Sequence, residues 1–127
     1  MHAEHLLEIR ELRMRFVTPD GSFNAVDGAD LDIAAGKTVC LVGESGSGKS
    51  VTSLSIMRLL AEPGRVVGGS IQFRDRAGTV HDLARIDQKA MRRIRGREIA
   101  MIFQEPMTSL NPLYTVGDQI AEMVMLH

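Results

Sequence analysis

The sequence has little of what marks several large classes of protein. Cysteine occurs once, as Cys40, so no internal disulfide can form; this fits a reducing cytoplasm, and we expect Cys40 to be a small buried hydrophobic residue. No apolar run approaches the roughly 20 residues that cross a bilayer. The N-terminus has no basic region followed by an apolar core, so no secretory signal is expected. The formal net charge of −1 gives no general attraction to nucleic acid.

What is present is typical of a soluble globular protein. The 127 residues are enough for one ordinary domain, with 44% apolar and 24% charged residues. The four histidines are scattered without metal-ligand spacing, and we expect all of them at the surface: His2, His5, His81 and His127.

The most informative segment is a glycine-rich run between an apolar segment and an amphipathic one. Its residues are Gly43, Glu44, Ser45, Gly46, Ser47, Gly48, Lys49 and Ser50, which fit the pattern G-x-x-x-x-G-K-[ST] at every fixed position. Residues 37–42 before it predict a buried parallel strand, and residues 51–60 after it predict a helix. A strand, a glycine loop and a helix in this order make up a P-loop unit.

Each part of this unit suits the binding of a nucleotide triphosphate. Successive N–H groups of a tight glycine loop form a nest for anions, and a helix N-terminus beginning near Val51 adds free N–H groups. Lys49 would reach the β- and γ-phosphates, and the Ser50 hydroxyl would be a ligand for Mg²⁺. The alternative is a chance glycine-serine loop, which the required residues and their flanking elements make rare.

The remaining patterns predict an alternation of strands and helices. A strand over 6–16 precedes the turn Thr18-Pro19-Asp20-Gly21. Pro63-Gly64 is expected to end the helix after the loop, and Gly68-Gly69 to form a turn. The other expected elements are a half-exposed strand within 25–33, a strand from 70 with a hairpin tip at 77–78, a helix over 87–95 capped by Asp87, a buried strand over 98–103, a loop over 104–112 and a helix over 115–126.

Two further groups of residues admit a functional interpretation and a simpler one. The basic run 89–97 could bind phosphate, lipid or an acidic partner, but we favour the solvated face of a short helix. Of the methionines, Met101 and Met123 are expected to fill the core, whereas Met107, in the loop, is the best candidate for contact with a partner.

These residues together resemble the ATPases of the ABC family. The glycine loop resembles the Walker A motif, and residues 101–112, MIFQEPMTSLNP, resemble the Q-loop segment of the importer branch for oligopeptides, dipeptides and glutathione. The run 115–120 that follows adds to this likeness, which covers the chain from Leu6 to His127 and implies an α/β fold. It would be a P-loop NTPase core of the ABC type, with an antiparallel N-terminal portion and the start of a helical subdomain.

The resemblance implies roles for individual residues. Gln104 would be the Q-loop glutamine, which touches Mg²⁺ and the attacking water and senses the membrane partner. Phe16 occupies the place of an aromatic residue that stacks on adenine, with Phe23 as a weaker rival; stacking of this kind contributes about 1–3 kcal/mol. The implied cofactors are ATP and Mg²⁺. The implied partners are a second ATPase domain, in a head-to-tail dimer, and transmembrane permease subunits that contact residues 104–112.

The sequence also departs from the family. The signature Leu-Ser-Gly-Gly-Gln, the Walker B strand and the switch histidine do not occur in it. We therefore expect residues 1–127 to be the N-terminal part of an ABC nucleotide-binding domain, without turnover on its own. The parent protein would be an ATP hydrolase at the cytoplasmic face of the membrane that powers import of peptides or related solutes.

Three other functions remain open at this point. One is a soluble ABC-type ATPase that acts on nucleic acid or the ribosome, although no nucleic-acid partner is expected. Another is a P-loop kinase or GTPase, which would need a substrate lid or a guanine-reading motif that we do not find. The last is a nucleotide-binding fragment with a regulatory role only.

Overall fold

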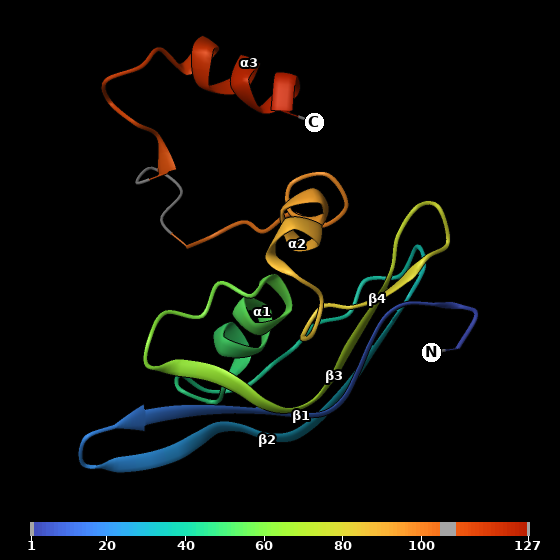
Figure 1. The fold of residues 1–127 in the computed structure, drawn as a ribbon, viewed down its shortest axis with the longest axis vertical. Helices are drawn as coiled ribbons and strands as arrows, with labels where there is room; N and C mark the ends of the chain where they lie inside the picture. The colour runs from blue at the N-terminus through green and yellow to red at the C-terminus, as the bar shows by residue number, and fades with distance from the viewer. Residues whose placement is uncertain (1, 105–108, 127) are drawn as a thin grey trace.

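The computed structural model describes residues 2–104 and 109–126 (Figure 1). Four strands form one sheet in the order β2-β1-β3-β4, with every pair antiparallel. In chain order the elements are β1 (His5–Thr18), β2 (Gly21–Ala34), α1 (Lys49–Met57), β3 (Gly64–Arg74), β4 (Val80–Asp82), α2 (Gln88–Ile94) and α3 (Val116–Leu126).

A long hairpin of β1 and β2 is the base of the structure. The predicted turn is confirmed: Thr18 pairs with Gly21, and the Thr18 hydroxyl donates a 2.9 Å hydrogen bond to the Gly21 carbonyl. Phe16 pairs with Phe23 two steps before the turn. The two aromatic side chains therefore lie together near the closed end of the hairpin.

An irregularity in the middle of β1 keeps its apolar side chains on one face. Ile9 and Leu12 are both fully buried although they are three residues apart, because the register shifts between them and Glu11 adopts a positive φ of 49°. Gly69 of β3 faces this irregularity with φ 85°, and a Cβ there would lie 2.5 Å from the Arg10 and Glu11 carbonyl oxygens. The prediction of a turn at Gly68-Gly69 was wrong: β3 runs through both glycines, which make room for the bulge in β1.

The hydrophobic core lies between one face of the sheet and the two helices α1 and α2 (Figure 1). Helix α2 is capped as predicted, since Asp87 Oδ1 accepts a 2.7 Å hydrogen bond from the Ala90 N–H. Arg95 joins the two helices by donating to the carbonyl oxygens of Met57 and Arg58, at 2.8 Å each. The buried core residues are Leu7, Ile9, Leu12, Met14, Val26, Ile71, Phe73, Leu83, Met91 and Ile94.

Helix α1 is shorter than predicted. It ends at Met57, and Arg58 at φ 50° closes it with a left-handed cap. Pro63-Gly64 therefore does not end the helix; Gly64 is already the first residue of β3.

The buried parallel strand predicted before the glycine loop, and the buried strand predicted over 98–103, are both absent from the described residues. Residues 37–42 and 98–103 contain no strand, and Val42 and Ile102 are 86% and 92% exposed. A parallel strand needs hydrogen-bonded neighbours and helices over both faces. In the part of the chain that the structure describes, the strands of the sheet pair only antiparallel, and the segment 98–103 makes just an isolated parallel bridge, from Ile99 to Arg95. Cys40, predicted to be buried, is exposed for the same reason.

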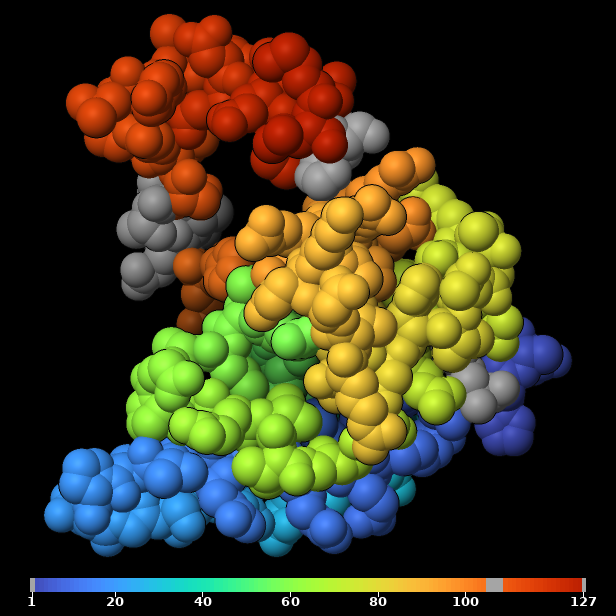
Figure 2. All heavy atoms as spheres, in the orientation of Figure 1, coloured from blue at the N-terminus to red at the C-terminus, as the bar shows by residue number. Residues whose placement is uncertain are grey.

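Helix α3 lies away from the sheet and from α1 (Figure 2). None of its residues is buried, and Met123, predicted to fill the core, is 52% exposed. Met101 is half-buried, whereas Met107 lies outside the described residues. Among the described helices, none combines the length and the apolarity that crossing a membrane would require.

Candidate nucleotide-binding site

The glycine loop folds around the amine of Lys49, the first residue of α1. Lys49 Nζ donates to the carbonyl oxygens of Gly43 and Glu44 at 2.6 and 2.5 Å, and to Ser47 Oγ at 3.0 Å. The Ser47 N–H donates to the Glu44 carbonyl at 3.2 Å, which closes a turn. A cationic amine is thus held inside the loop by three oxygen atoms.

Gly48 carries the chain from the loop into α1. It is the N-cap, with φ 90°, and a Cβ at this position would lie 2.8 Å from the Ala25 carbonyl oxygen. Glycine is therefore required both by the left-handed backbone and by the close approach of β2.

The N-terminus of α1 is suited to an anion. Among the described residues, no side chain caps this helix. The first N–H groups of a helix lack intrahelical acceptors and carry the positive end of its dipole. Phosphate oxygens would satisfy these donors next to the Lys49 ammonium group, so the local chemistry fits a nucleotide.

A cleft of about 500 Å³ opens between the hairpin and the loop. This volume is within the ~300–1,000 Å³ typical of small-molecule sites. Phe16 and Phe23 lie at one side of the cleft, with their ring centroids 5.4 Å apart and their planes tilted by 32°. The lining residues are Phe16, Phe23, Ala25, Ser45, Gly46, Ser47, Gly48, Lys49, Ser50, Val51 and Gln104.

The structure brings most of the predicted site residues together at this cleft. Phe16, Ser45 to Val51 and Gln104 line it although they come from three separate parts of the sequence. Gly43 and Glu44 do not line it, and their carbonyl groups hold Lys49 instead. Gln104 also borders a second cleft of about 500 Å³, which is lined by Leu41, Lys49 and Ile102 among others.

Sequence reasoning did not name Ala25 as a lining residue and did not predict that Phe23 would lie beside Phe16. Ala25 reaches the cleft because β2 passes beside Gly48. Phe23 was the weaker rival for the aromatic position, yet it lies against Phe16. The turn at 18–21 could have indicated this, since residues equally far from a hairpin turn face each other across the two strands.

Comparison with known proteins shows the family to which the chain belongs. The family model for the ABC transporter domain matches residues 26–126, so the chain belongs to the ABC transporter family.

Individual relatives narrow the likeness to the ATP-binding proteins of peptide importers. The chain is 56% identical over 128 residues to a protein of Brucella ovis named provisionally as a peptide import ATP-binding protein, and this match covers 100% of the chain. It is 49% identical over 123 residues to the oligopeptide transport ATP-binding protein AppD of Bacillus subtilis, and this match covers 96% of the chain. The chain spans 38% and 36% of the lengths of these two relatives.

Proposed function

We propose that residues 43–51 bind the phosphates of MgATP and that the chain is the N-terminal part, residues 1–127, of an ABC nucleotide-binding domain. The observation that carries this proposal is the loop that holds the Lys49 ammonium group beside the uncapped N-terminus of α1. Phe16, with Phe23 beside it, would stack on the adenine at the other side of the same cleft.

Ser50 and Gln104 are the proposed holders of Mg²⁺. Both offer oxygen atoms, which hard divalent cations prefer, and both line the same cleft. A bound Mg²⁺ would neutralise part of the phosphate charge. The residues of this chain would bind the nucleotide, orient it and keep a positive charge next to its terminal phosphates.

Substitution of Lys49 tests the binding site. In the full-length protein, we expect Lys49→Ala to weaken MgATP binding by about 1.5–3 kcal/mol, because a charge-assisted contact is lost. The matched control is Lys37→Ala, which removes an exposed lysine that does not line the cleft. Calorimetry should show a loss with the first variant only, and equal affinities in both would refute the assignment of Lys49.

For the whole protein we propose ATP hydrolysis that powers the import of peptides or related small solutes. It would dimerise head-to-tail with a second ATPase domain and lie at the cytoplasmic face of the membrane, against permease subunits. The names of the relatives and the family match support this proposal. Residues 104–112 with α3 would form the contact with the permease.

Gln104 provides the test of this contact. Gln104→Ala in the assembled transporter is expected to leave MgATP affinity largely intact, because Lys49 and Ser50 still hold the phosphates and the Mg²⁺, and to lower the hydrolysis that the transported solute stimulates. Phe103→Ala, a neighbouring change outside the nucleotide cleft, is the control for local disturbance. Undiminished stimulation in the Gln104 variant would rule out a coupling role for this residue.

A further inference from the structure

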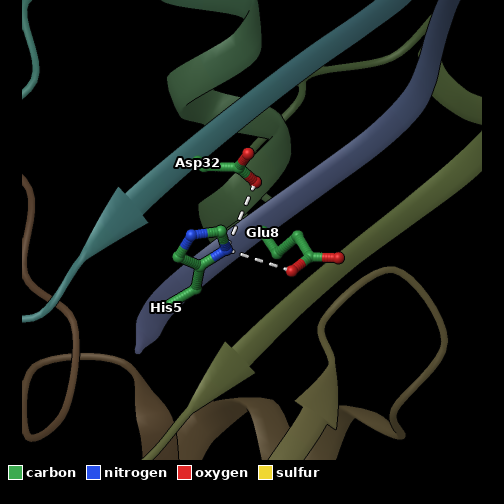
Figure 3. A group of neighbouring side chains, drawn as sticks. All are labelled: His5, Glu8 and Asp32. Atoms are coloured by element: carbon green, nitrogen blue, oxygen red, sulfur yellow. Dashed lines mark hydrogen bonds and ion pairs between the residues drawn. The ribbon is translucent and has the colours of Figure 1, made fainter. Parts of the chain in front are cut away.

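A nitrogen–oxygen cluster lies at the open end of the β1–β2 hairpin (Figure 3). His5 Nδ1 is 3.2 Å from Glu8 Oε2 and 3.6 Å from Asp32 Oδ1, and the three ligand atoms lie within 4.8 Å of one another. Sequence spacing did not reveal this group because Asp32 comes from the neighbouring strand. His5, expected at the surface, is half-buried, with 22% of its side chain exposed.

The cluster brings two carboxylates, those of Glu8 and Asp32, next to the imidazole of His5. Glu8 is directly opposite Asp32 in the β1–β2 register, and like charges in that position repel each other. Arg10 offsets part of this repulsion, with Nη1 at 2.5 Å from Asp32 Oδ1 and Nη2 at 3.6 Å from Glu8 Oε1.

Two of the three separations between ligand atoms agree with the coordination geometry of a small transition-metal ion. Zinc bonds to nitrogen and oxygen are about 2.0–2.2 Å, so two ligand atoms of a tetrahedral site lie roughly 3.4 Å apart. The two separations from His5 Nδ1, 3.2 and 3.6 Å, bracket this value. His2 offers a second imidazole nearby, since its ring centroid is 5.2 Å from that of His5.

We propose that His5, Glu8 and Asp32 form a binding site for a divalent transition-metal ion of the zinc class, with His2 as the fourth ligand. One imidazole and two carboxylates are ligands that such ions accept. The ion would join the first residues of β1 to the last residues of β2 and would relieve the repulsion between the two carboxylates. Binding uses the lone pair of neutral His5 Nδ1, so a proton on that atom is released when the metal binds.

This site is separate from the nucleotide cleft. His5 precedes Phe16 by eleven residues of the same strand, and an extended strand rises about 3.3 Å per residue. The metal cluster and the aromatic side of the cleft are therefore at opposite ends of the hairpin. Zinc binding here needs no nucleotide and is independent of the Mg²⁺ proposed at Ser50 and Gln104.

The test is zinc titration of the full-length protein after chelator treatment and without nucleotide. Isothermal titration calorimetry should show one zinc equivalent that is lost, or at least tenfold weaker, in His5→Ala. The matched control is His81→Ala, because among the described residues His81 pairs with a single carboxylate, Asp75 Oδ2 at 2.8 Å. This control should keep the wild-type stoichiometry and affinity.

A second variant shows whether a loss of zinc binding in His5→Ala comes from misfolding. Asp32→Asn keeps the size of the side chain and removes one charged ligand, so it should also weaken zinc binding at least tenfold while MgATP binding stays intact. Titration with Co²⁺ should give visible absorption bands in the wild type that are reduced in both variants. If His5→Ala and Asp32→Asn bind zinc with wild-type stoichiometry and affinity, the proposal is overturned.

Discussion

Two regions of this molecule have similar apolar sequences and opposite environments. Ile9 and Ile71, in the sheet, are fully buried, whereas Ile102, in the predicted strand 98–103, is 92% exposed. The sheet strands pair with neighbours that follow closely in the chain, as β1 does with β2. An apolar run predicts the capacity to form a strand, but a strand appears only where another strand is available to pair with it.

The largest expected effect is association of the 127-residue chain when it is produced alone. Large apolar residues of 37–42, 98–103 and α3 are exposed in it, and extended apolar surface favours association. Sedimentation velocity should show oligomers or aggregates, and a phosphate-release assay should show no steady turnover. MgATP should still stabilise the folded fraction, by about 2.7 kcal/mol at 100 times its dissociation constant.

A monodisperse monomer with a sharp thermal transition would contradict this prediction. So would ATP hydrolysis that Lys49→Ala abolishes. The first result would mean that the exposed segments find partners within the 127 residues, and the second that this part of the domain hydrolyses ATP without the missing motifs.

A pair of isoleucine substitutions compares the two regions directly. Ile9→Ala should lower the free energy of unfolding by about 2–5 kcal/mol, because it leaves a cavity in the closed core. Ile102→Ala in the same 127-residue chain should change it by less than about 0.5 kcal/mol. Urea unfolding of both variants measures the difference.

The same two substitutions in the full-length protein show whether the environment of Ile102 changes there. If further chain covers the segment 98–103, Ile102→Ala becomes costly there while the effect of Ile9→Ala stays the same. Equally small effects of Ile102→Ala in both proteins would show that the segment 98–103 stays exposed in the full-length protein as well.

Gly48 tests how tightly the loop depends on β2. Gly48→Ala should cost about 1–3 kcal/mol, since φ is 90° and the new Cβ would lie 2.8 Å from the Ala25 carbonyl oxygen. Gly36→Ala is the control: φ is 69°, but no atom lies within 4 Å of its Cβ. Gly36→Ala should lower the free energy of unfolding only by the cost of a left-handed backbone, about 1–2 kcal/mol. Chemical denaturation should rank Gly48→Ala as the more harmful, and the reverse order would mean that the contact with β2 is not maintained.

The smallest effect concerns pH and the hairpin of β3 and β4. The hydrogen bond from His81, followed by that from the Thr79 N–H, holds the pKa of Asp75 below its ordinary value. A lowered pKa in the folded state means that the stabilisation is fully present above the pKa of the unfolded chain, about 3.9, and is lost as the pH falls through the folded pKa. The stability difference between the wild type and Asp75→Asn should therefore shrink as the pH falls from about 5 to 2.

Thermal melts across this pH range provide the measurement. Asp20→Asn, in the exposed turn of the first hairpin, is the control for the loss of a carboxylate elsewhere. A constant difference between the wild type and Asp75→Asn would contradict the proposed linkage.

Local features were predictable from the sequence because short-range chemistry determines them. The turn at 18–21, the Asp87 cap and the helix after the glycine loop each depend on residues within a few positions of one another, and each is present. The phosphate-binding groups from Gly43 to Ser50 were predictable for the same reason, since the loop, its lysine and the helix N-terminus are adjacent in the sequence. Membership of the ABC transporter family follows from the same motifs and is confirmed by the family match.

The tertiary structure alone decided which distant residues meet. Phe16, Phe23 and Gln104 share one cleft because the hairpin folds beside the loop, and His5 faces Asp32 because of the register of two paired strands. It also decided that residues 37–42 and 98–103 are exposed. Hydrophobic periodicity reports what each side chain prefers, whereas burial and pairing depend on whether a second surface is present to receive it.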